Sequence, residues 1–341
     1  MSHDLEIKNG QASMFSVKET PWHGLGHIIQ EAPSIEEGIR LAGLDWKVAL
    51  KPVGILGSGE QTLGYNAIVR EDTGKSLGVV GPKYKPLQNK DAFNFFNPFI
   101  QSGQAKLETA GCLKDGKKVW ILAEIVDGTS EVMNGDQIKR YVLLSDDKSG
   151  KQSVRVGFTT VRVVCQNTLS MAHQASDSND TKKTLDKLIR VRHTGQVVQN
   201  LESVRELMDL ETKNFLATMD MYKQLTRRDI NQADIQRFVE MTWFSNHFDN
   251  YGQINNDKLH TRTANRLKST VEQISELVET GMGSDINGVK GTVWGLYNAG
   301  TEFLTHHANS DNEKRLNSLW FGDNEKVNAK MLDLALKMAT A

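Results

Sequence analysis

Two arginines set into an apolar run are the residues whose types and spacing most suggest chemistry. Residues 154–165 are mostly β-branched or apolar, which is typical of a buried strand, yet Arg155 and Arg162 lie within them. Burying a positively charged side chain in such a strand costs free energy unless an anion pairs with it. We expect Asn167 or Thr168 to cap a short helix that ends near residue 172, with free backbone N–H groups close to the arginines. The combination predicts a phosphate-binding site.

This site carries a geometric condition. Arg155 and Arg162 are seven residues apart, so a regular strand places them on opposite faces of a sheet. Both side chains reach one ligand only if a bulge at Gly157 turns one of them to the other face of the sheet.

A basic segment follows this strand. Residues 174–184 are small and polar, which predicts a mobile loop. On or beside it are five cations that we expect to follow a nucleic-acid backbone: Lys182, Lys183, Lys187, Arg190 and Arg192. The alternative is a scattered, solvated basic face.

Aromatic and imidazole groups complete the candidate nucleic-acid site. We expect Trp22 and Tyr84 to stack on bases, and His23 either to join them or to hold the backbone of its loop. We find no phosphate-binding glycine motif, nucleophile elbow or metal-ligand spacing of His, Cys and carboxylates, so we predict no catalytic residue, metal or cofactor.

The composition is that of an ordinary globular protein. Of the 341 residues, 38% are hydrophobic and 24% charged, and the net charge is -1, which argues against a uniformly basic nucleic-acid protein. The charge is uneven, however: residues 136–193 hold eleven Lys or Arg against six Asp, a local charge of +5. With two cysteines, no apolar run long enough for a membrane span and no signal-peptide pattern at the N-terminus, we expect a cytoplasmic protein.

The first half of the chain must position these residues, and its pattern favours antiparallel strands. We expect strands at 46–53, 64–70, 77–80, 106–113, 119–126, 138–144, 154–165 and 188–191, in a sheet of seven or eight strands. Asp115-Gly116 predicts a hairpin between two of them. Ser34 should open one short helix, and Asn89 should cap another that places Phe93, Phe95, Phe96 and Phe99 beneath the sheet.

After Gly195 the apolar spacing changes to three and four residues, which is typical of helices. We expect helices at about 197–224, 231–245, 258–280, 290–307 and 325–339. The sequence therefore predicts an α+β protein, with an antiparallel β-rich domain at 1–195 and an all-helical domain at 196–341.

Five blocks, in order along the chain, resemble the phage/plasmid-like protein family, the domain of unknown function numbered nine-three-two. They are residues 21–26 (PWHGLG), 84–89 (YKPLQN) with Ala92-Phe93, 162–169 (RVVCQNTL), 291–299 (GTVWGLYNA) and 318–322 (SLWFG). The resemblance implies a phage, plasmid or integrated element in a bacterial host cell. The strand-rich half is similar, by fold analogy alone, to single-strand annealing recombinases of the RecT and Red-beta kind. The resemblance implies no catalytic residue.

These observations favour a non-enzymatic DNA-binding protein that forms homo-oligomers and holds single-stranded DNA in replication or recombination. Two alternatives stay open. One is an interaction protein or anti-defence factor of a mobile element, with a host or phage protein as partner. The other is a metal-dependent nuclease or nucleotide-processing enzyme that uses His23.

Overall fold

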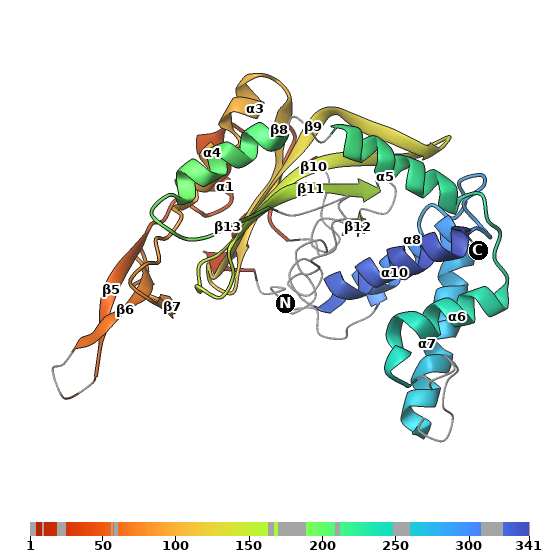
Figure 1. Cartoon of the computed structure of the whole chain (residues 1–341). Coiled ribbons are helices and arrows are strands. Elements are labelled where there is room, and N and C mark those ends of the chain that lie inside the picture. The colour runs from red at the N-terminus through yellow and green to blue at the C-terminus, as the bar shows by residue number, and fades with distance from the viewer. Residues whose placement is uncertain are drawn as a thin grey trace.

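The computed structural model of the chain describes residues 5–8, 10–18, 25–55, 57, 61–162, 167–169, 189–208, 212–247, 260–307 and 323–340. Within these residues the strands lie mostly in the first half of the chain and the helices mostly in the second (Figure 1). This confirms the predicted α+β class.

An eight-stranded sheet forms the centre of the first half. Its spatial order is β12-β11-β10-β9-β8-β3-β4, and β13 also pairs with β11. All pairs are antiparallel except β3 with β4. The strands are β3 (Met14–Val17), β4 (His27–Ile29), β8 (Ala105–Leu113), β9 (Lys118–Met133), β10 (Asp136–Asp147), β11 (Val154–Arg162), β12 (Asn167–Leu169) and β13 (Ile189–Val191).

The hairpin between β8 and β9 forms where Asp115-Gly116 predicts it. Lys114, Asp115 and Gly116 have φ angles of 53°, 57° and 90°. Such left-handed backbone is easy for glycine and tolerated by aspartate, and its twist suits a tight hairpin. This turn lies at the same end of the sheet as the turn between β10 and β11, because Lys148 N donates to Lys117 O at 2.8 Å.

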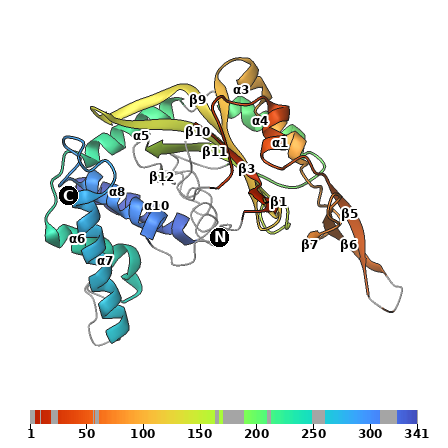
Figure 2. The same cartoon turned by 180° about the vertical axis from the view of Figure 1, so that it is seen from behind.

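The strands predicted between residues 46 and 80 form a separate sheet, not a part of the central one. They are β5 (Val48–Gly54), β6 (Gln61–Arg70) and β7 (Ser76–Val80), paired antiparallel in that order. This three-stranded sheet, here called the arm, projects from the body of the molecule (Figures 1 and 2). A two-stranded ribbon of β1 (Ile7–Lys8) and β2 (Gln11–Ala12) lies nearer the N-terminus.

Short helices build the main core against one face of the central sheet. They are α1 (Ile35–Leu41), α2 (Asn89–Asn94), α3 (Asn97–Gln101) and α4 (Val197–Met208). Phe93, Phe95 and Phe96 are buried in that core, as predicted. Ser34 caps α1 by accepting a hydrogen bond from Glu37 N at 3.2 Å. Asn89, however, is the first residue of α2 and not its cap.

The second core belongs to the helices that follow. They are α5 (Thr212–Leu225), α6 (Gln232–Trp243), α7 (Thr261–Thr280), α8 (Val293–Glu302) and α10 (Asp323–Thr340), with a 3-10 turn η3 (Ser245–His247) and a π-helical turn η5 (Phe303–His307). They agree with the predicted helical segments. Val132 of β9 and Ile138 of β10 are buried in the same cluster, so one end of the central sheet lies in the helical core. In the described part of the chain, no helix has both the length and the apolar character needed to cross a membrane.

Candidate nucleic-acid interface

Arg162 lies inside the protein, paired with a carboxylate. Its Nε and Nη2 donate to the two oxygens of Asp136 at 2.7 and 2.9 Å, and neither residue is exposed. The guanidinium also donates to the carbonyl oxygens of Met282 and Gly283, each at 3.1 Å. Trp294 Nε1 donates to the same carboxylate at 2.7 Å. The anion that pairs with Arg162 is therefore Asp136, and the predicted phosphate-binding role of Arg162 is wrong.

The predicted helix after this arginine is also wrong at its start. Asn167 and Thr168 belong to β12, and Asn167 pairs with Arg162 in the antiparallel register. Their backbone extends the sheet, so they do not form a helix N-terminus that could bind an anion. Five other predicted site residues lie outside the described residues: Trp22, His23, Lys182, Lys183 and Lys187.

Arg155 and Arg162 do not converge on one ligand. The register of β10 with β11 runs without a shift from the Ile138–Arg162 pair to the Ser145–Arg155 pair. No bulge forms at Gly157, so the two arginines point to opposite faces of the sheet.

Arg155 lies instead beside Arg190, another predicted site residue. The register pairs Arg155 of β11 directly with Arg190 of β13. Side chains that oppose each other across antiparallel strands lie close together, and like charges in that arrangement repel. Arg190 is exposed and Arg155 is half-buried, so the pair concentrates positive charge at the sheet edge.

Lys118 and Lys114 add to this charge. Burial lowers the pKa of Lys118. The charge of Asp147 acts in the opposite direction, while the charges of Lys114 and Arg155 lower the pKa further. Lys118 of β9 pairs with Asp147 of β10, and Arg155 of β11 pairs with Ser145 of β10. Ser145 and Asp147 are two residues apart on β10, so Lys118 and Arg155 lie on the same face of the sheet. We call Lys114, Lys118, Arg155 and Arg190 the basic cluster.

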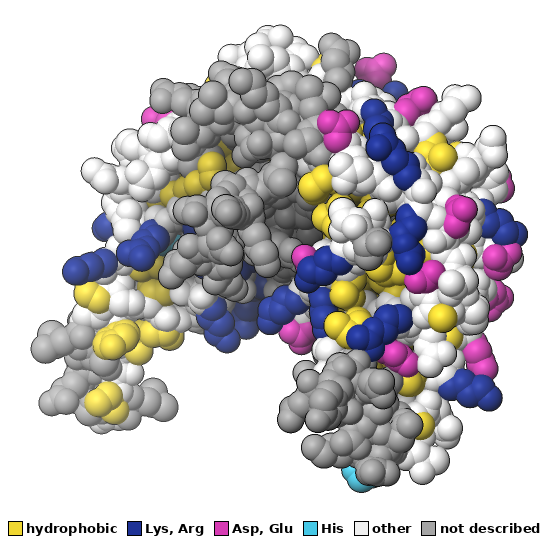
Figure 3. Space-filling view, turned by 45° about the vertical axis from the view of Figure 1, so that its right-hand side comes forward, with side chains coloured by type: hydrophobic (Ala, Val, Ile, Leu, Met, Phe, Trp, Pro, Cys, Tyr) yellow, Lys and Arg dark blue, Asp and Glu magenta, His cyan; other side chains and the backbone are white. Residues whose placement is uncertain are grey.

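Two further cations lie close to the basic cluster along the chain. Exposed Lys151 lies in the β10–β11 turn and exposed Arg192 follows β13. Two nearby carboxylates are engaged by lysines: Asp115 pairs with Lys75, and Asp146 with Lys148 at 2.7 Å. Figure 3 shows Lys and Arg side chains gathered below and beside the hollow between the arm and the helices.

Tyr84 lies beneath this end of the sheet in a buried polar group. Its ring stacks on that of His193, with 4.7 Å between the ring centres, and it is only partly exposed. His193 Nε2 lies 3.1 Å from Asp146 Oδ1, and Lys148 Nζ donates to Asp146 and to Leu87 O. His193 occupies one face of the Tyr84 ring, and the role of Tyr84 in base stacking stays a prediction.

The buried polar group favours an ionised Asp146. Burial alone would raise the pKa of this carboxyl, but the charges and hydrogen bonds of Lys148 and His193 outweigh burial and lower it. The group ties β10 to His193, which follows β13 by two residues. It therefore holds in place the short strand that carries Arg190.

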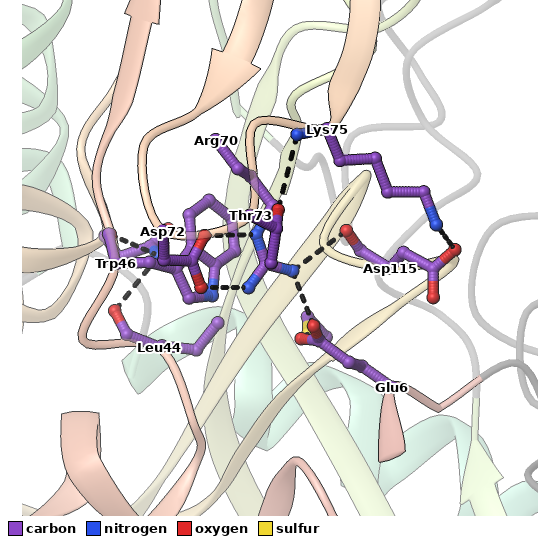
Figure 4. Close-up of polar contacts among 10 residues, drawn as sticks. Glu6, Leu44, Trp46, Arg70, Asp72, Thr73, Lys75 and Asp115 are labelled. Carbon is purple, nitrogen blue, oxygen red and sulfur yellow. Dashed lines mark hydrogen bonds and ion pairs between the residues drawn. The ribbon is translucent and has the colours of Figure 1, made fainter. Parts of the chain in front are cut away.

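A second buried arginine, which sequence reasoning missed, joins the arm to the body (Figure 4). Arg70 donates to both oxygens of Asp72 at 3.0 and 2.7 Å, and to Glu6 at 2.7 Å. Its guanidinium lies 4.1 Å from the centre of the Trp46 ring. The close spacing of Arg70 and Asp72 is a sequence signal for part of this contact, but nothing local indicates Glu6.

The described residues bring together no group of three or more His, Cys, Asp or Glu that could hold a metal ion. Cys112 is buried, with its Sγ 3.3 Å from Glu6 Oε2.

Comparison with known proteins gives one family match. The family model described as "Domain of unknown function (DUF932)" matches residues 76–320. No curated protein matches the chain, and no solved structure matches it. The matched range includes the basic cluster and most of the helical half.

Proposed function

We propose a function for this chain, which belongs to the DUF932 family, a family of unknown function. It binds nucleic acid through the basic cluster, with single-stranded DNA as the preferred ligand. As part of the same proposal, the chain is a non-enzymatic, homo-oligomeric protein of a phage or plasmid. It acts in the cytoplasm of the host during replication or recombination.

The observation that carries this proposal is the opposed pair Arg155 and Arg190, with Lys118 and Lys114 beside it. Four cations from three strands and one turn repel one another at the same end of a sheet. Positive charge gathered at one place on a surface attracts a polyanion. A nucleic-acid backbone is a polyanion whose phosphates accept bonds from Lys and Arg regardless of base sequence.

The preference for a single strand rests on which elements carry the cations. All four lie on strands or in a hairpin turn, and none lies on a helix that could enter a major groove. Sheet surfaces lined with cations are a recurrent way of tracking single-stranded backbones. Trp22 and the lysines at 182, 183 and 187 stay predicted contributors to base stacking and to the clamp.

The test is fluorescence anisotropy with labelled oligonucleotides of equal length, one single-stranded and one double-stranded, over a series of salt concentrations. We expect tighter binding of the single strand, with affinity falling linearly on a log–log plot against salt. Absence of binding at low salt, or binding that salt does not weaken, would rule out a phosphate-binding role.

A protein-interaction role is the second candidate, because the arm exposes apolar side chains. Val79 and Tyr65 are 56% and 52% exposed. Val79 pairs with Ala67, two residues from Tyr65, so the two lie on one face of the arm. Such a face favours contact with a protein. If Tyr65→Ser/Val79→Ser abolishes nuclease-resistant co-purification of a host protein but leaves oligonucleotide binding unchanged, the arm has this role.

The metal-dependent nuclease alternative gains no support from the described residues, which supply no carboxylate and histidine group for a metal. Incubating labelled single-stranded DNA with the protein, with and without divalent cations, tests it directly. Metal-dependent cleavage that co-purifies with the protein through successive columns would favour the enzyme.

A further inference from the structure

Three segments of the chain that meet where the arm joins the body contain no Asp or Glu. They are residues 81–90, 148–156 and 189–194, and they hold eight Lys or Arg. In Figure 3 Lys and Arg side chains gather beside the root of the arm. The whole chain has a net charge of -1, so these segments concentrate positive charge that acidic residues balance elsewhere.

Hydrogen bonds and a ring contact hold the first segment against the other two. Lys85 N donates to His193 O at 3.0 Å, and the Tyr84 ring stacks on the His193 ring. Lys148 Nζ, which is buried, donates to Leu87 O at 2.6 Å. The connector between the arm and α2 is therefore fixed against the end of β10 and the residues that follow β13.

The β10–β11 turn also lies directly against the arm. A Cβ built at Gly78 would lie 2.2 Å from Ser149 O, and one built at Gly150 would lie 2.3 Å from Val80 Cγ1. Only glycine allows so close an approach, so β7 and the turn are in direct contact. Because β13 pairs with β11 just after this turn, the three segments form one surface around the buried polar group described above.

Four exposed cations of this surface are available to a ligand. They are Lys83 and Lys85 in the connector, Lys151 in the β10–β11 turn and Arg192 after β13. Within the part of the chain that the structure describes, none of their side chains forms an ion pair or a hydrogen bond. An anion can therefore bind them without first breaking a contact of the described residues. We call these four residues the outer cations.

We propose that the outer cations bind phosphates of the same single strand as the basic cluster, an inference that rests on the proposed function. Arg192 follows Arg190 by two residues, and the next residue, His193, is hydrogen-bonded to Lys85. A strand that leaves the sheet edge at Arg190 therefore meets Arg192 and then the connector. Cationic surfaces that follow the phosphates over several nucleotides are typical of proteins that bind single strands. The interface thus extends from the sheet edge to the root of the arm.

The side chains around the outer cations favour a polyanion over a protein partner. The large apolar side chains that are exposed in the described part of the chain all lie outside the three segments. Protein interfaces have an apolar centre that is depleted in charged residues, whereas interfaces with nucleic acid are polar and strongly positive. The composition of this surface therefore fits phosphates better than an acidic protein.

The first test labels the lysines of the full-length protein with N-hydroxysuccinimide acetate, with and without a long oligothymidylate, and reads the labelling by peptide mass spectrometry. We expect the bound strand to protect Lys83, Lys85 and Lys151. Lys268 of α7 and Lys326 of α10 are the controls, because they are 80% and 79% exposed and should react equally in both samples. If bound DNA leaves Lys83 and Lys85 as reactive as before, or if poly-L-glutamate protects them equally well, the inference is overturned.

The second test measures the salt dependence of single-stranded DNA binding in Lys83→Gln/Lys85→Gln, with circular dichroism to check the fold. We expect the slope of log affinity against log salt to be shallower by about 1.4, because two phosphate contacts are lost. The control Lys268→Gln/Lys326→Gln changes the net charge equally and should leave the slope unchanged.

The outcomes separate this inference from the proposed function. A slope that is unchanged in Lys83→Gln/Lys85→Gln but shallower in Arg155→Gln/Arg190→Gln overturns the inference and leaves the proposed function intact. A parent protein that binds no single-stranded DNA at low salt overturns both.

Discussion

Arg155 and Arg162 carry the same charge on the same strand, yet their surroundings are opposite. Arg162 faces Asp136, Trp294 and two backbone carbonyls in the interior. Arg155 faces another arginine at the sheet edge. The sequence indicates that each needs an anion, but the partner of Arg162 is 26 residues away and its other contacts are more than 100 residues away. Local pattern cannot distinguish an internal anion from a bound one.

This contrast predicts how Arg162→Met will behave. Removing the guanidinium leaves the buried Asp136 carboxylate without its countercharge, which should lower the free energy of unfolding by about 3–5 kcal/mol. Urea denaturation followed by circular dichroism measures the loss. Oligonucleotide binding by the folded fraction should not change. A variant of normal stability that has lost binding would restore Arg162 as a phosphate ligand.

Tyr84 predicts a change of stability at alkaline pH. Burial first, then the charges of Asp146 and Asp147, raise the pKa of its hydroxyl in the folded protein. An unfolded tyrosine ionises near pH 10, so above that pH the unfolded state has lost a proton that the folded state retains. The free energy of unfolding therefore falls as pH rises, with a contribution from Tyr84 that approaches about 1.4 kcal/mol per pH unit.

The control is Tyr84→Phe. Among the described residues the Tyr84 hydroxyl has no hydrogen-bond partner, so the substitution should cost little at pH 7 and should remove this part of the alkaline decline. Urea denaturation of both proteins at pH 7, 9 and 10.5 makes the comparison. If the free energy of unfolding falls equally with pH in both proteins, Tyr84 ionises as easily in the folded state as in the unfolded state.

At the scale of elements, the sequence predicted best the features formed by residues that are close together along the chain. Asp115-Gly116 makes the β8–β9 hairpin, and Ser34 caps α1. The arm was predicted as strands, but the contacts of Arg70 with Glu6 and with the Trp46 ring, which join it to the body, are long-range and no local pattern shows them. Asn167 shows where local prediction fails. Its residue type favours a helix cap, yet it pairs with Arg162 at the edge of β11 and extends the sheet.

The arm provides a prediction about packing. A Cβ at Gly78 would lie 2.2 Å from the Ser149 carbonyl oxygen, so Gly78→Ala must push β7 away from the β10–β11 turn. We expect destabilisation of about 1–3 kcal/mol, measured by urea denaturation. Gly81→Ala is the matched control, because nothing lies within 4 Å of its Cβ position. If both variants match the parent protein, β7 does not pack on that turn.

At the scale of the whole molecule, each of the two cores contains residues from the other half of the chain. Val197 and Leu201 of α4 belong to the sheet core, whereas Val132 and Ile138 of the β9–β10 hairpin belong to the helical core. The change from strand to helix periodicity near residue 195 was visible in the sequence. Long-range packing of this kind was not, because it depends on contacts between distant segments.

Shared cores predict cooperative unfolding. Ile138→Ala removes apolar contacts inside the helical cluster from a residue of the sheet, and should lower the free energy of unfolding by about 2–5 kcal/mol. We expect one transition in urea, reported equally by far-ultraviolet circular dichroism and tryptophan fluorescence. Two separate transitions, with only one displaced by the substitution, would show that the sheet and the helices unfold independently.

The account as a whole depends on the basic cluster contacting phosphates. The most direct test compares the salt dependence of single-stranded DNA binding in the parent protein, in Arg155→Gln/Arg190→Gln and in the control Arg237→Gln on α6. We predict a slope of log affinity against log salt that is shallower by about 1.4 in the double variant, as expected for two lost phosphate contacts, and unchanged in the control. An unchanged slope in a folded double variant would contradict the proposed interface.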